Sequence, residues 1–464
     1  MELTARDLAC IVGGEVLAGD PDVRVSSYSI DSRVLVPGDC FVALRGARDG
    51  HHFVTDAIAK GAVVALVSEA VDVSSAGATL VRVSDPLAAL GALASHARAL
   101  MADTTVVAIS GSAGKTATKD LAAAALAASR RVHASPLSFN NESGLPLTVL
   151  SAPDDTEVLI AEMGARFAGN VTTLVEIARP QVGVITHVGM AHAEHLGGRE
   201  GIARVKGELV EALPASGIAV LNAACDASPG LAARTVARVL RVGSAPDADV
   251  VFRDVVLDGD LRARFVLETP WGRAPVALAV RGEHQVENAA MAAAVALELG
   301  APLEAVVSGL GMAQTAALRM ELVRTAGGIV VINDAYNSSP TSAAAAVRSL
   351  AHLPITGRRI AVLGPMLELG SDAAEEHAAL GALAAAAGID VLVAVGAGAD
   401  ELAEGARGSS APGSGISVVT VPDAAAAAGY LVGEVRFGDA VLVKASRAVG
   451  LEAVADALVR WVPA

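Results

Sequence analysis

A glycine-rich stretch in the first third of the chain has the residue types that bind phosphate. Residues 111–116 read GSAGKT and follow an apolar run at residues 106–109. Glycines let the backbone approach a phosphate closely, and the amides of a helix that begins there point at it. A lysine adds a cation, and a threonine hydroxyl can bind Mg²⁺. The stretch therefore predicts a nucleoside triphosphate site, the alternative being an ordinary glycine-rich turn.

The spacing matches a short form of the phosphate loop, GxxGKT. The longer pattern has another glycine five residues before Gly114, where this chain has Ile109. An apolar strand before the loop and an alanine-rich helix after it still favour phosphate binding over a plain turn.

Acidic and histidine side chains follow other apolar runs. Glu162 closes one run, where a carboxylate beside a phosphate loop suits Mg²⁺, although helix capping fits the same position. A later segment contains His187, His192 and His195. Their spacing does not give the HExxH pattern of a zinc site, and a single histidine is more often structural. Lys206, further on, is by residue type a surface lysine.

A third strand end carries Asp334, which is followed by a helix start at Pro340. Such an aspartate can accept hydrogen bonds from ribose hydroxyls. It is equally a common residue of strand-to-helix turns. The residues alone leave both roles open.

The elements that must position these groups alternate regularly between apolar runs and helical segments. Central runs at residues 105–109, 158–162, 182–186 and 218–221 predict a parallel sheet with crossover helices. Residues 250–280 alternate apolar and charged side chains, which predicts antiparallel strands. Runs at 329–332, 360–363, 391–395, 418–421 and 441–444 predict a second, Rossmann-like sheet.

The length and alternation predict an α/β protein of three domains. These are a small N-terminal α/β domain at residues 1–95, a central P-loop-type parallel-sheet domain at 96–318 and a C-terminal Rossmann-like domain at 319–464.

Composition narrows the class of protein further. A net charge of −15 disfavours nucleic acid as a partner. The chain has no apolar run of membrane-spanning length and no signal peptide, which predicts a cytoplasmic protein without stable membrane insertion. Three scattered cysteines predict neither a disulfide framework nor a structural zinc site. We expect a monomer.

Taken together, the motifs resemble the Mur ligases of bacterial cell-wall synthesis over essentially the full length. The motifs are SIDSR at 29–33, GHHFV at 50–54, GSAGKT, NNESGLPLTVL at 140–150, EMGA at 162–165, AHAEHLGG at 191–198, GEHQVENAA at 282–290, NDAYNSSP at 333–340, VLGPMLELG at 362–370 and KASR at 444–447. The segments at 140–150 and 362–370 are most similar to the members that use D-alanyl-D-alanine.

The resemblance implies ATP-dependent amide formation through an acyl phosphate. UDP-N-acetylmuramoyl-tripeptide would bind the N-terminal domain, ATP the central domain, and D-alanyl-D-alanine the C-terminal domain. Two Mg²⁺ ions and a carbamylated lysine at Lys206 are implied as well.

The resemblance also implies roles for individual residues. The implied ATP contacts are Gly111, Ser112, Gly114, Lys115, Thr116, Asn288, Arg319 and Asp334. The implied metal ligands are Thr116, Glu162, His192 and carbamylated Lys206, and the implied catalytic residues are Lys115, Lys206 and His192. The implied substrate contacts are Ser32, Arg33, Asn141, Tyr336, Asn337 and Ser446.

Some positions depart from the family pattern without removing a phosphate or metal group. His187 and Gln285 stand where Asn is usual, Leu318 and Ala445 where Gly is usual, Pro365 where Asp is usual, and Asn170 where an acidic residue is usual. Two alternatives to the dipeptide-adding activity are a sister ligase that adds another amino acid and a catalytically silent nucleotide-binding homologue.

Overall fold

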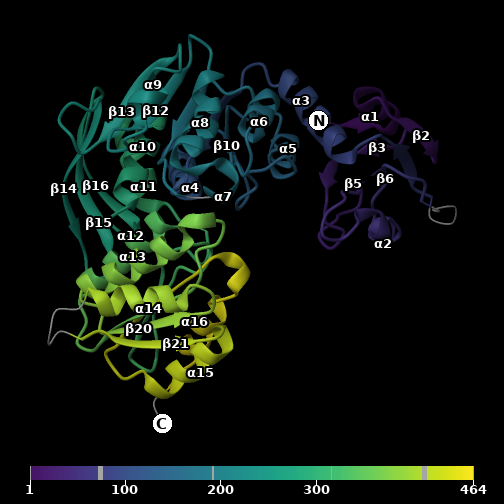
Figure 1. Ribbon diagram of the computed structural model, residues 1–464. Helices are drawn as coiled ribbons and strands as arrows, with labels where there is room; N and C mark the ends of the chain where they lie inside the picture. Colours follow the sequence, from purple (N-terminus) through teal and green to yellow (C-terminus); the bar gives the residue numbers. More distant parts are fainter. Residues whose placement is uncertain (1, 72–76, 191–192, 315, 410–414, 463–464) are drawn as a thin grey trace.

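The computed structural model describes residues 2–71, 77–190, 193–314, 316–409 and 415–462 (Figure 1). Three main sheets follow one another along the chain, and each is covered by helices. The predicted fold class, an α/β protein built from three such units, is confirmed. The residue boundaries of the three domains stay a prediction.

The N-terminal unit contains a five-stranded sheet of order β2-β7-β6-β5-β4. Its elements are β1 (Leu3–Thr4), α1 (Ala5–Val12), β2 (Glu15–Ala18), β3 (Arg24–Val25), β4 (Ser27–Ser29), β5 (Asp39–Val42), α2 (Val54–Ala59), β6 (Val64–Val67) and β7 (Thr79–Arg82), with a 3₁₀ turn at Gly50–Phe53. Helix α3 (Pro86–Leu100) packs on α1 and also on α5 and α6 of the central unit. It therefore joins the two units (Figure 1).

The central unit is a nine-stranded sheet of order β16-β15-β14-β13-β12-β11-β8-β10-β9. Its strands are β8 (Thr105–Ser110), β9 (Val132–Ala134), β10 (Val158–Glu162), β11 (Val182–Ile185), β12 (Ile218–Asn222), β13 (Arg238–Gly243), β14 (Val250–Leu257), β15 (Arg262–Thr269) and β16 (Gly272–Arg281). Its helices are α4 (Lys115–Leu126), α5 (Gly144–Leu150), α6 (Asn170–Ala178), α7 (Ala193–Leu196), α8 (Gly198–Glu211), α9 (Ser228–Ala232), α10 (Gln285–Glu298) and α11 (Leu303–Met312).

Strands β8 and β10 are buried along nearly all their length, as expected for parallel strands covered on both faces. The chain leaves β8 toward β9 and β10 on one side and continues to β11 on the other. Ligands of α/β sheets bind at such a switch point, outside the carboxyl ends of the strands. The phosphate loop follows β8, so it lies where the fold favours a ligand.

The predicted antiparallel strands at residues 250–280 are present. Strands β14 to β16 form a meander, and β14 pairs in parallel with β13, so the meander extends the central sheet. Helix α10 is rich in alanine and almost fully buried between α4 and strands β12 to β15. Its small side chains allow the close packing that brings Asn288 to the phosphate loop.

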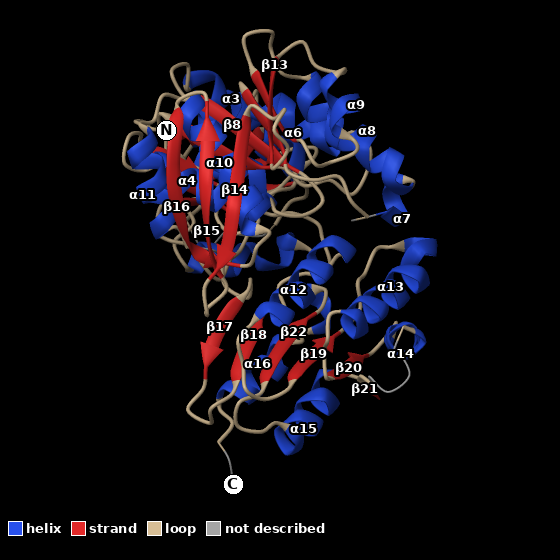
Figure 2. Cartoon of the chain, turned by 90° about the vertical axis from the view of Figure 1, so that its left-hand side faces the viewer, coloured by secondary structure: helices blue, strands red, loops and turns tan. Residues whose placement is uncertain are grey.

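The C-terminal unit is a six-stranded sheet of order β17-β18-β22-β19-β20-β21, parallel except at β17 (Figure 2). Its strands are β17 (Glu321–Arg324), β18 (Val330–Asn333), β19 (Arg359–Leu363), β20 (Val391–Val395), β21 (Ser417–Val421) and β22 (Ala440–Lys444). Its helices are α12 (Pro340–His352), α13 (Ala373–Ala386), α14 (Ala399–Gly408), α15 (Ala424–Glu434) and α16 (Glu452–Val459), with 3₁₀ turns at Gly370–Asp372 and Arg447–Val449. All five predicted strands are present, and β17 is an additional edge strand.

Within the described part of the chain, no helix is long and apolar enough to cross a membrane.

Candidate active site

The phosphate loop joins the buried end of β8 to the start of α4 at Lys115. The Lys115 ammonium donates a hydrogen bond to the Gly111 carbonyl oxygen at 2.8 Å, which folds the side chain back over the loop. Burial lowers the pKa of Lys115, and the nearby Glu162 carboxylate opposes that shift. The loop therefore presents a cation that has lost part of its hydration, next to backbone amides at a helix N-terminus.

Two glycines of this loop are required by geometry. Gly114 has φ +83°, and a Cβ there would lie 2.5 Å from the Asn288 Oδ1 atom. Gly111 has φ +150°, and a Cβ there would overlap the Thr186 hydroxyl. Only glycine lets the loop pass so close to α10 and to the end of β11.

Ser112 connects the loop by hydrogen bonds to the segment after β11. Its amide donates to the His187 carbonyl at 2.7 Å, and its hydroxyl donates to the Gly189 carbonyl at 2.8 Å. The Gly189 amide in turn donates to the Ser112 hydroxyl at 3.0 Å. Side chain and backbone of Ser112 thus fix the loop, and its predicted nucleotide contact stays a prediction.

A threonine–glutamate pair lies beneath the loop. The Thr116 hydroxyl donates to Glu162 Oε2 at 2.8 Å, and the Asn140 side-chain amide donates to Glu162 Oε1 at 2.8 Å. Both Thr116 and Glu162 are almost fully buried. A hydroxyl beside a carboxylate is a donor set of hard oxygens, which fits Mg²⁺.

Lys206 on α8 is not a surface residue. Its side chain is 1% exposed, and burial lowers its pKa well below the usual range, with the charge of Lys115 adding to the effect. The default interpretation from its residue type is therefore wrong, because α8 turns this side chain into the core. A buried amine of lowered pKa is readily deprotonated.

The histidine-rich segment is described only in part. His192, predicted as a metal ligand, lies outside the described residues. The His187 ring is partly buried, which lowers its pKa, while the His195 ring packs against Phe167 with 5.2 Å between ring centroids.

Asp334 lies at the end of β18 and is held from two sides. Its Oδ2 atom pairs with the Lys444 ammonium at 2.7 Å, and its Oδ1 atom accepts a hydrogen bond from the Met320 amide at 3.1 Å. Lys444 also donates to the Asn337 carbonyl at 2.8 Å. Leu318 and Met320 adopt left-handed backbone conformations, with φ +62° and +50°. The left-handed φ of Leu318 explains the glycine usual in the family at that position.

Arg319 extends from the C-terminal unit into the phosphate site. Its Nη2 atom donates to the Thr116 hydroxyl at 3.1 Å. Its Nε atom is buried and has no hydrogen-bond partner among the described residues. A buried guanidinium nitrogen without an acceptor fits an anionic ligand at this place.

Asn288 on α10 approaches the loop from the other side. Its Oδ1 atom accepts a hydrogen bond from the Thr118 hydroxyl at 3.3 Å, and its side-chain amide donates to Gln285 Oε1 at 3.0 Å. Gln285, where the family usually has Asn, therefore still orients Asn288.

The structure brings most predicted nucleotide residues to one place, and Tyr336 joins them, because its ring centroid lies 4.1 Å from the Arg319 guanidinium carbon. Two other predicted substrate residues lie apart from this place. Ser32 and Arg33 belong to the N-terminal unit, which stands away from the central sheet (Figure 1). There the Ser32 carbonyl accepts a hydrogen bond from Lys60 at 3.0 Å, and exposed Arg33 pairs with Asp31 at 2.6 Å.

The other predicted substrate residues make contacts within the chain. Asn141 Oδ1 accepts a hydrogen bond from the Gly144 amide at 2.9 Å at the start of α5. The Ser446 hydroxyl accepts one from the Leu367 amide at 3.0 Å, and Asn337 is exposed. Their predicted substrate roles stay predictions.

Sequence reasoning missed the loop at residues 135–140. Buried Lys119 on α4 donates to the Ser135 carbonyl at 2.6 Å and to the Leu137 carbonyl at 3.0 Å. The Ser135 hydroxyl accepts a hydrogen bond from the Glu162 amide at 3.1 Å. No local pattern marks this loop, although its last residue, Asn140, belongs to a family motif.

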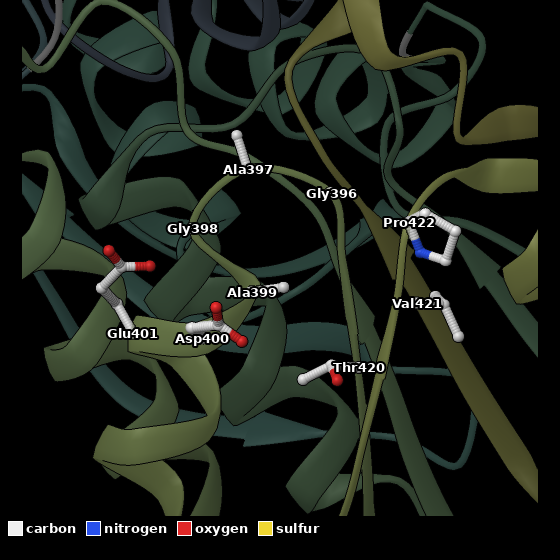
Figure 3. A pocket seen from close by; sticks show the side chains of 9 residues that line it. All are labelled: Gly396, Ala397, Gly398, Ala399, Asp400, Glu401, Thr420, Val421 and Pro422. Carbon is white, nitrogen blue, oxygen red and sulfur yellow. The ribbon is translucent and has the colours of Figure 1, made fainter.

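A separate hollow of about 490 Å³ lies at the carboxyl ends of β20 and β21 (Figure 3). It faces the N-terminus of α14, but Asp400 and Glu401 line it and oppose an anion. This hollow takes no part in the site described above.

These features define a P-loop nucleotide-binding enzyme. They are the parallel sheet with its phosphate loop, the Thr116–Glu162 pair and two lysines of lowered pKa. Residues 109–296 match the Mur ligase middle domain, residues 318–447 match the Mur ligase, glutamate ligase domain, and residues 24–98 match the Mur ligase family, catalytic domain. The chain belongs to the Mur ligase family, and the predicted resemblance is confirmed.

Similar proteins of known name agree with this family. The chain is 44% identical to the UDP-N-acetylmuramoyl-tripeptide–D-alanyl-D-alanine ligase of Mycobacterium tuberculosis H37Rv, covering 99% of this chain and 98% of the relative. It is 33% identical to the Escherichia coli K12 enzyme of the same name, covering 85% and 86%. The structure of MurF from Acinetobacter baumannii superposes with a TM-score of 0.88 at 30% identity, covering 99% of both chains.

A further solved structure, MurF ligase from Thermotoga maritima in complex with ADP, has a TM-score of 0.79 at 28% identity. The match covers 94% of this chain and 97% of the Thermotoga maritima chain.

Proposed function

We propose that this protein joins D-alanyl-D-alanine to UDP-N-acetylmuramoyl-tripeptide in an ATP-dependent step of peptidoglycan precursor synthesis. The observation that carries the proposal is the Thr116–Glu162 pair beneath the phosphate loop, in a chain 44% identical to a ligase of that name over nearly its whole length. Because the reaction uses ATP, the proposed location is the cytoplasm.

The chemistry has two balanced steps. A carboxylate oxygen of the tripeptide attacks the γ-phosphorus of ATP, which forms an acyl phosphate and releases ADP. The dipeptide amine then attacks the acyl carbon, and inorganic phosphate leaves with the bond electrons as the amine loses a proton. Both steps bring negative groups together, so cations must neutralise them. Lys115 of the central unit and Arg319 of the C-terminal unit both lie at the phosphate loop, where they can do so.

The buried oxygen donors fit a bound Mg²⁺. Thr116 and Glu162 would hold one ion, and carbamylated Lys206 with His192 would hold a second. When bound, Mg²⁺ supplies a Lewis acid that neutralises phosphate charge. Asn140 keeps Glu162 turned toward Thr116 through its hydrogen bond to the carboxylate.

The surroundings of Lys206 favour its carbamylation. The reaction needs an uncharged amine, which attacks the carbon of CO₂ and loses a proton. Burial and the nearby Lys115 charge both lower the Lys206 pKa and so supply that form. The same Lys115 charge that repels an ammonium attracts the carbamate anion.

The remaining residues divide between the substrates. Asn288 and Asp334 contact ATP, the latter through the ribose, with Gly111, Ser112 and Gly114 around the phosphates. Ser32 and Arg33 hold the uridine nucleotide in a domain at residues 1–95. The peptide and dipeptide contacts are Asn141, Tyr336, Asn337 and Ser446, with the dipeptide in a domain at residues 319–464 that follows a central domain at 96–318.

Phosphate release with ATP, Mg²⁺ and UDP-N-acetylmuramoyl-tripeptide tests the proposal. We expect release only when D-alanyl-D-alanine is also present, together with a product whose mass equals the sum of both peptides less water. Release with a single amino acid instead of the dipeptide would indicate a sister ligase. An absence of ATP turnover with every acceptor would indicate a silent homologue.

A Lys206→Ala variant tests the carbamate. We expect ligation to be lost and partly restored by added short carboxylates such as formate or acetate, which replace the missing anion. Lys115→Ala serves as the matched control, because the loss of a cation is not repaired by an anion. Equal response of both variants would contradict a carbamate at Lys206.

A further inference from the structure

Tyr336 joins the C-terminal unit to the central unit through both ends of its side chain. The Arg319 guanidinium carbon lies 4.1 Å from the centroid of the Tyr336 ring. The Tyr336 hydroxyl donates a hydrogen bond to the Ser138 hydroxyl at 2.8 Å. Ser138 belongs to the central loop at residues 135–140, whereas Arg319 and Tyr336 flank β17 and β18. One side chain therefore contacts a phosphate-site cation and the facing domain.

The backbone of Tyr336 also supports Arg319. Its amide donates to the Leu318 carbonyl at 3.1 Å, and Leu318 is one of the two left-handed residues that flank Arg319. A turn with non-glycine left-handed residues keeps its shape only when surrounding contacts hold it. The ring and the amide of Tyr336 supply such contacts.

The loop that receives the Tyr336 hydroxyl is itself tied to the candidate metal site. Lys119 holds its backbone through the Ser135 and Leu137 carbonyls, and Asn140 at its end donates to Glu162. A continuous line of contacts thus runs from the Arg319 turn through Tyr336 and Ser138 to the carboxylate of Glu162.

We propose that Tyr336 is a positioning residue that holds Arg319 against the phosphate site when the C-terminal unit docks on the loop at residues 135–140. The inference rests on the proposed function, because it takes Arg319 to neutralise transferred phosphate. The cation–π contact sets the guanidinium plane, and the hydroxyl bond to Ser138 sets the distance between the two units. Each contact contributes separately to keeping Arg319 near Thr116.

Steady-state kinetics of the full-length enzyme test the positioning role with two Tyr336 variants, one that loses only the hydroxyl and one that also loses the ring. Tyr336→Phe keeps the ring and loses the hydrogen bond, so we expect kcat to fall about fivefold, the size of one neutral hydrogen bond. Ser138→Ala should reproduce that fall, and the double variant should be no worse than either single variant. Tyr336→Leu also removes the ring and should lower kcat about 50-fold, because the cation–π contact is lost as well.

A double-mutant cycle of Tyr336 with Arg319 separates a positioning role of Tyr336 from a structural or substrate-binding role. In an Arg319→Ala background, Tyr336→Leu should have no further effect on kcat, whereas a structural defect would add to it. KM for D-alanyl-D-alanine should stay unchanged in Tyr336→Phe, because the ring proposed to contact the dipeptide is kept and the lost hydroxyl is bound to Ser138. Tyr430→Phe on α15, far along the chain from the site, is the control and should match the wild type.

Three results would overturn the inference. They are additive losses in the Arg319→Ala background, a rise confined to the dipeptide KM, and a wild-type kcat in Tyr336→Leu. An inactive wild-type enzyme with these substrates would instead count against the proposed function, so the two failures are distinguishable.

Discussion

The nucleotide site has one face on the central sheet and another on the C-terminal sheet, and the two faces are held by different means. On the central face, Glu162 ends β10, and Lys115 and Thr116 begin the helix that follows the neighbouring strand β8. Their hydrogen bonds stay within that unit, apart from the bond from Arg319. Two glycines with positive φ let the loop close around the phosphate position.

On the C-terminal face, Arg319 lies in a turn with left-handed Leu318 and Met320. Arg319 bonds to Thr116 of the central unit and is linked to Ser138 through Tyr336. The central face is therefore preorganised by folding, whereas the C-terminal face is assembled by docking of one unit on another. Substitutions should differ accordingly: those on the central face should remove chemistry, and those on the C-terminal face should weaken assembly.

The largest effect is expected on the central face, at Lys115. Lys115→Met should lower kcat/KM about 10³-fold, because a transition-state cation next to the phosphates is lost. Since burial already disfavours the charged amine, an apolar side chain of similar shape should leave the melting temperature unchanged or higher. Phosphate-release assays and thermal unfolding measure the two outcomes. A clear fall in melting temperature would show that Lys115 also stabilises the fold.

Gly114→Ala should come next, at about 10²-fold lower activity, because the new Cβ would push Asn288 and the loop apart. Gly169 offers a matched control: it has φ +84°, begins α6 as Gly114 begins α4, and a Cβ there meets nothing within 4 Å. Gly169→Ala should cost only about 1 kcal/mol of stability, with activity retained. Equal activity losses in the two variants would mean that backbone strain, not the approach to Asn288, makes glycine necessary.

Asp334→Asn tests the C-terminal face. We expect KM for ATP to rise about tenfold, the effect of losing a charge-assisted hydrogen bond, with a smaller change in kcat. The variant leaves the buried Lys444 charge without its carboxylate, so stability should fall as well.

The double variant Asp334→Asn with Lys444→Met separates these two effects. It removes the uncompensated charge and should recover the melting temperature while the KM for ATP stays high. Recovery of ATP affinity together with stability would make Asp334 a purely structural residue.

The sequence predicts the strands that have a local apolar pattern and misses those that depend on long-range pairing. Four strands of the central sheet and five of the C-terminal sheet were predictable because each is a short apolar run between helices, whereas the parallel strands β9 and β13 were not predicted. Edge strand β17 was not, since residues 321–324 read ELVR and are half-buried or exposed. The joining of β14 to β13 follows from long-range pairing, which no local pattern encodes.

In the site, the closeness of Thr116 and Glu162 was predictable, because adjacent parallel strands end at the same edge of a sheet. Lys206 could be assigned only by family resemblance, since its burial depends on how α8 packs. Ser138 was missed because its partner Tyr336 comes from another unit. Lys119 was missed because its partners are backbone carbonyls of a loop further along the central unit, which no local pattern encodes.

The smallest effect is expected at an exposed contact between the two faces. Arg166 of the central unit pairs with Glu368 of the C-terminal unit at 3.2 Å, and the arginine side chain is 66% exposed. Arg166→Ala should change kcat/KM by no more than about twofold, because water and salt screen such pairs. Arg6→Ala is the control, because Arg6 is 63% exposed and pairs with Asp22 within the N-terminal unit.

The two variants are best compared at low and high salt. Any loss in Arg166→Ala should shrink as ionic strength rises, while Arg6→Ala should show none at either concentration. A tenfold loss that persists in high salt would mean that exposed charges hold the C-terminal face in place. Docking would then depend on the rim of the interface more than on the buried contacts of Arg319 and Tyr336.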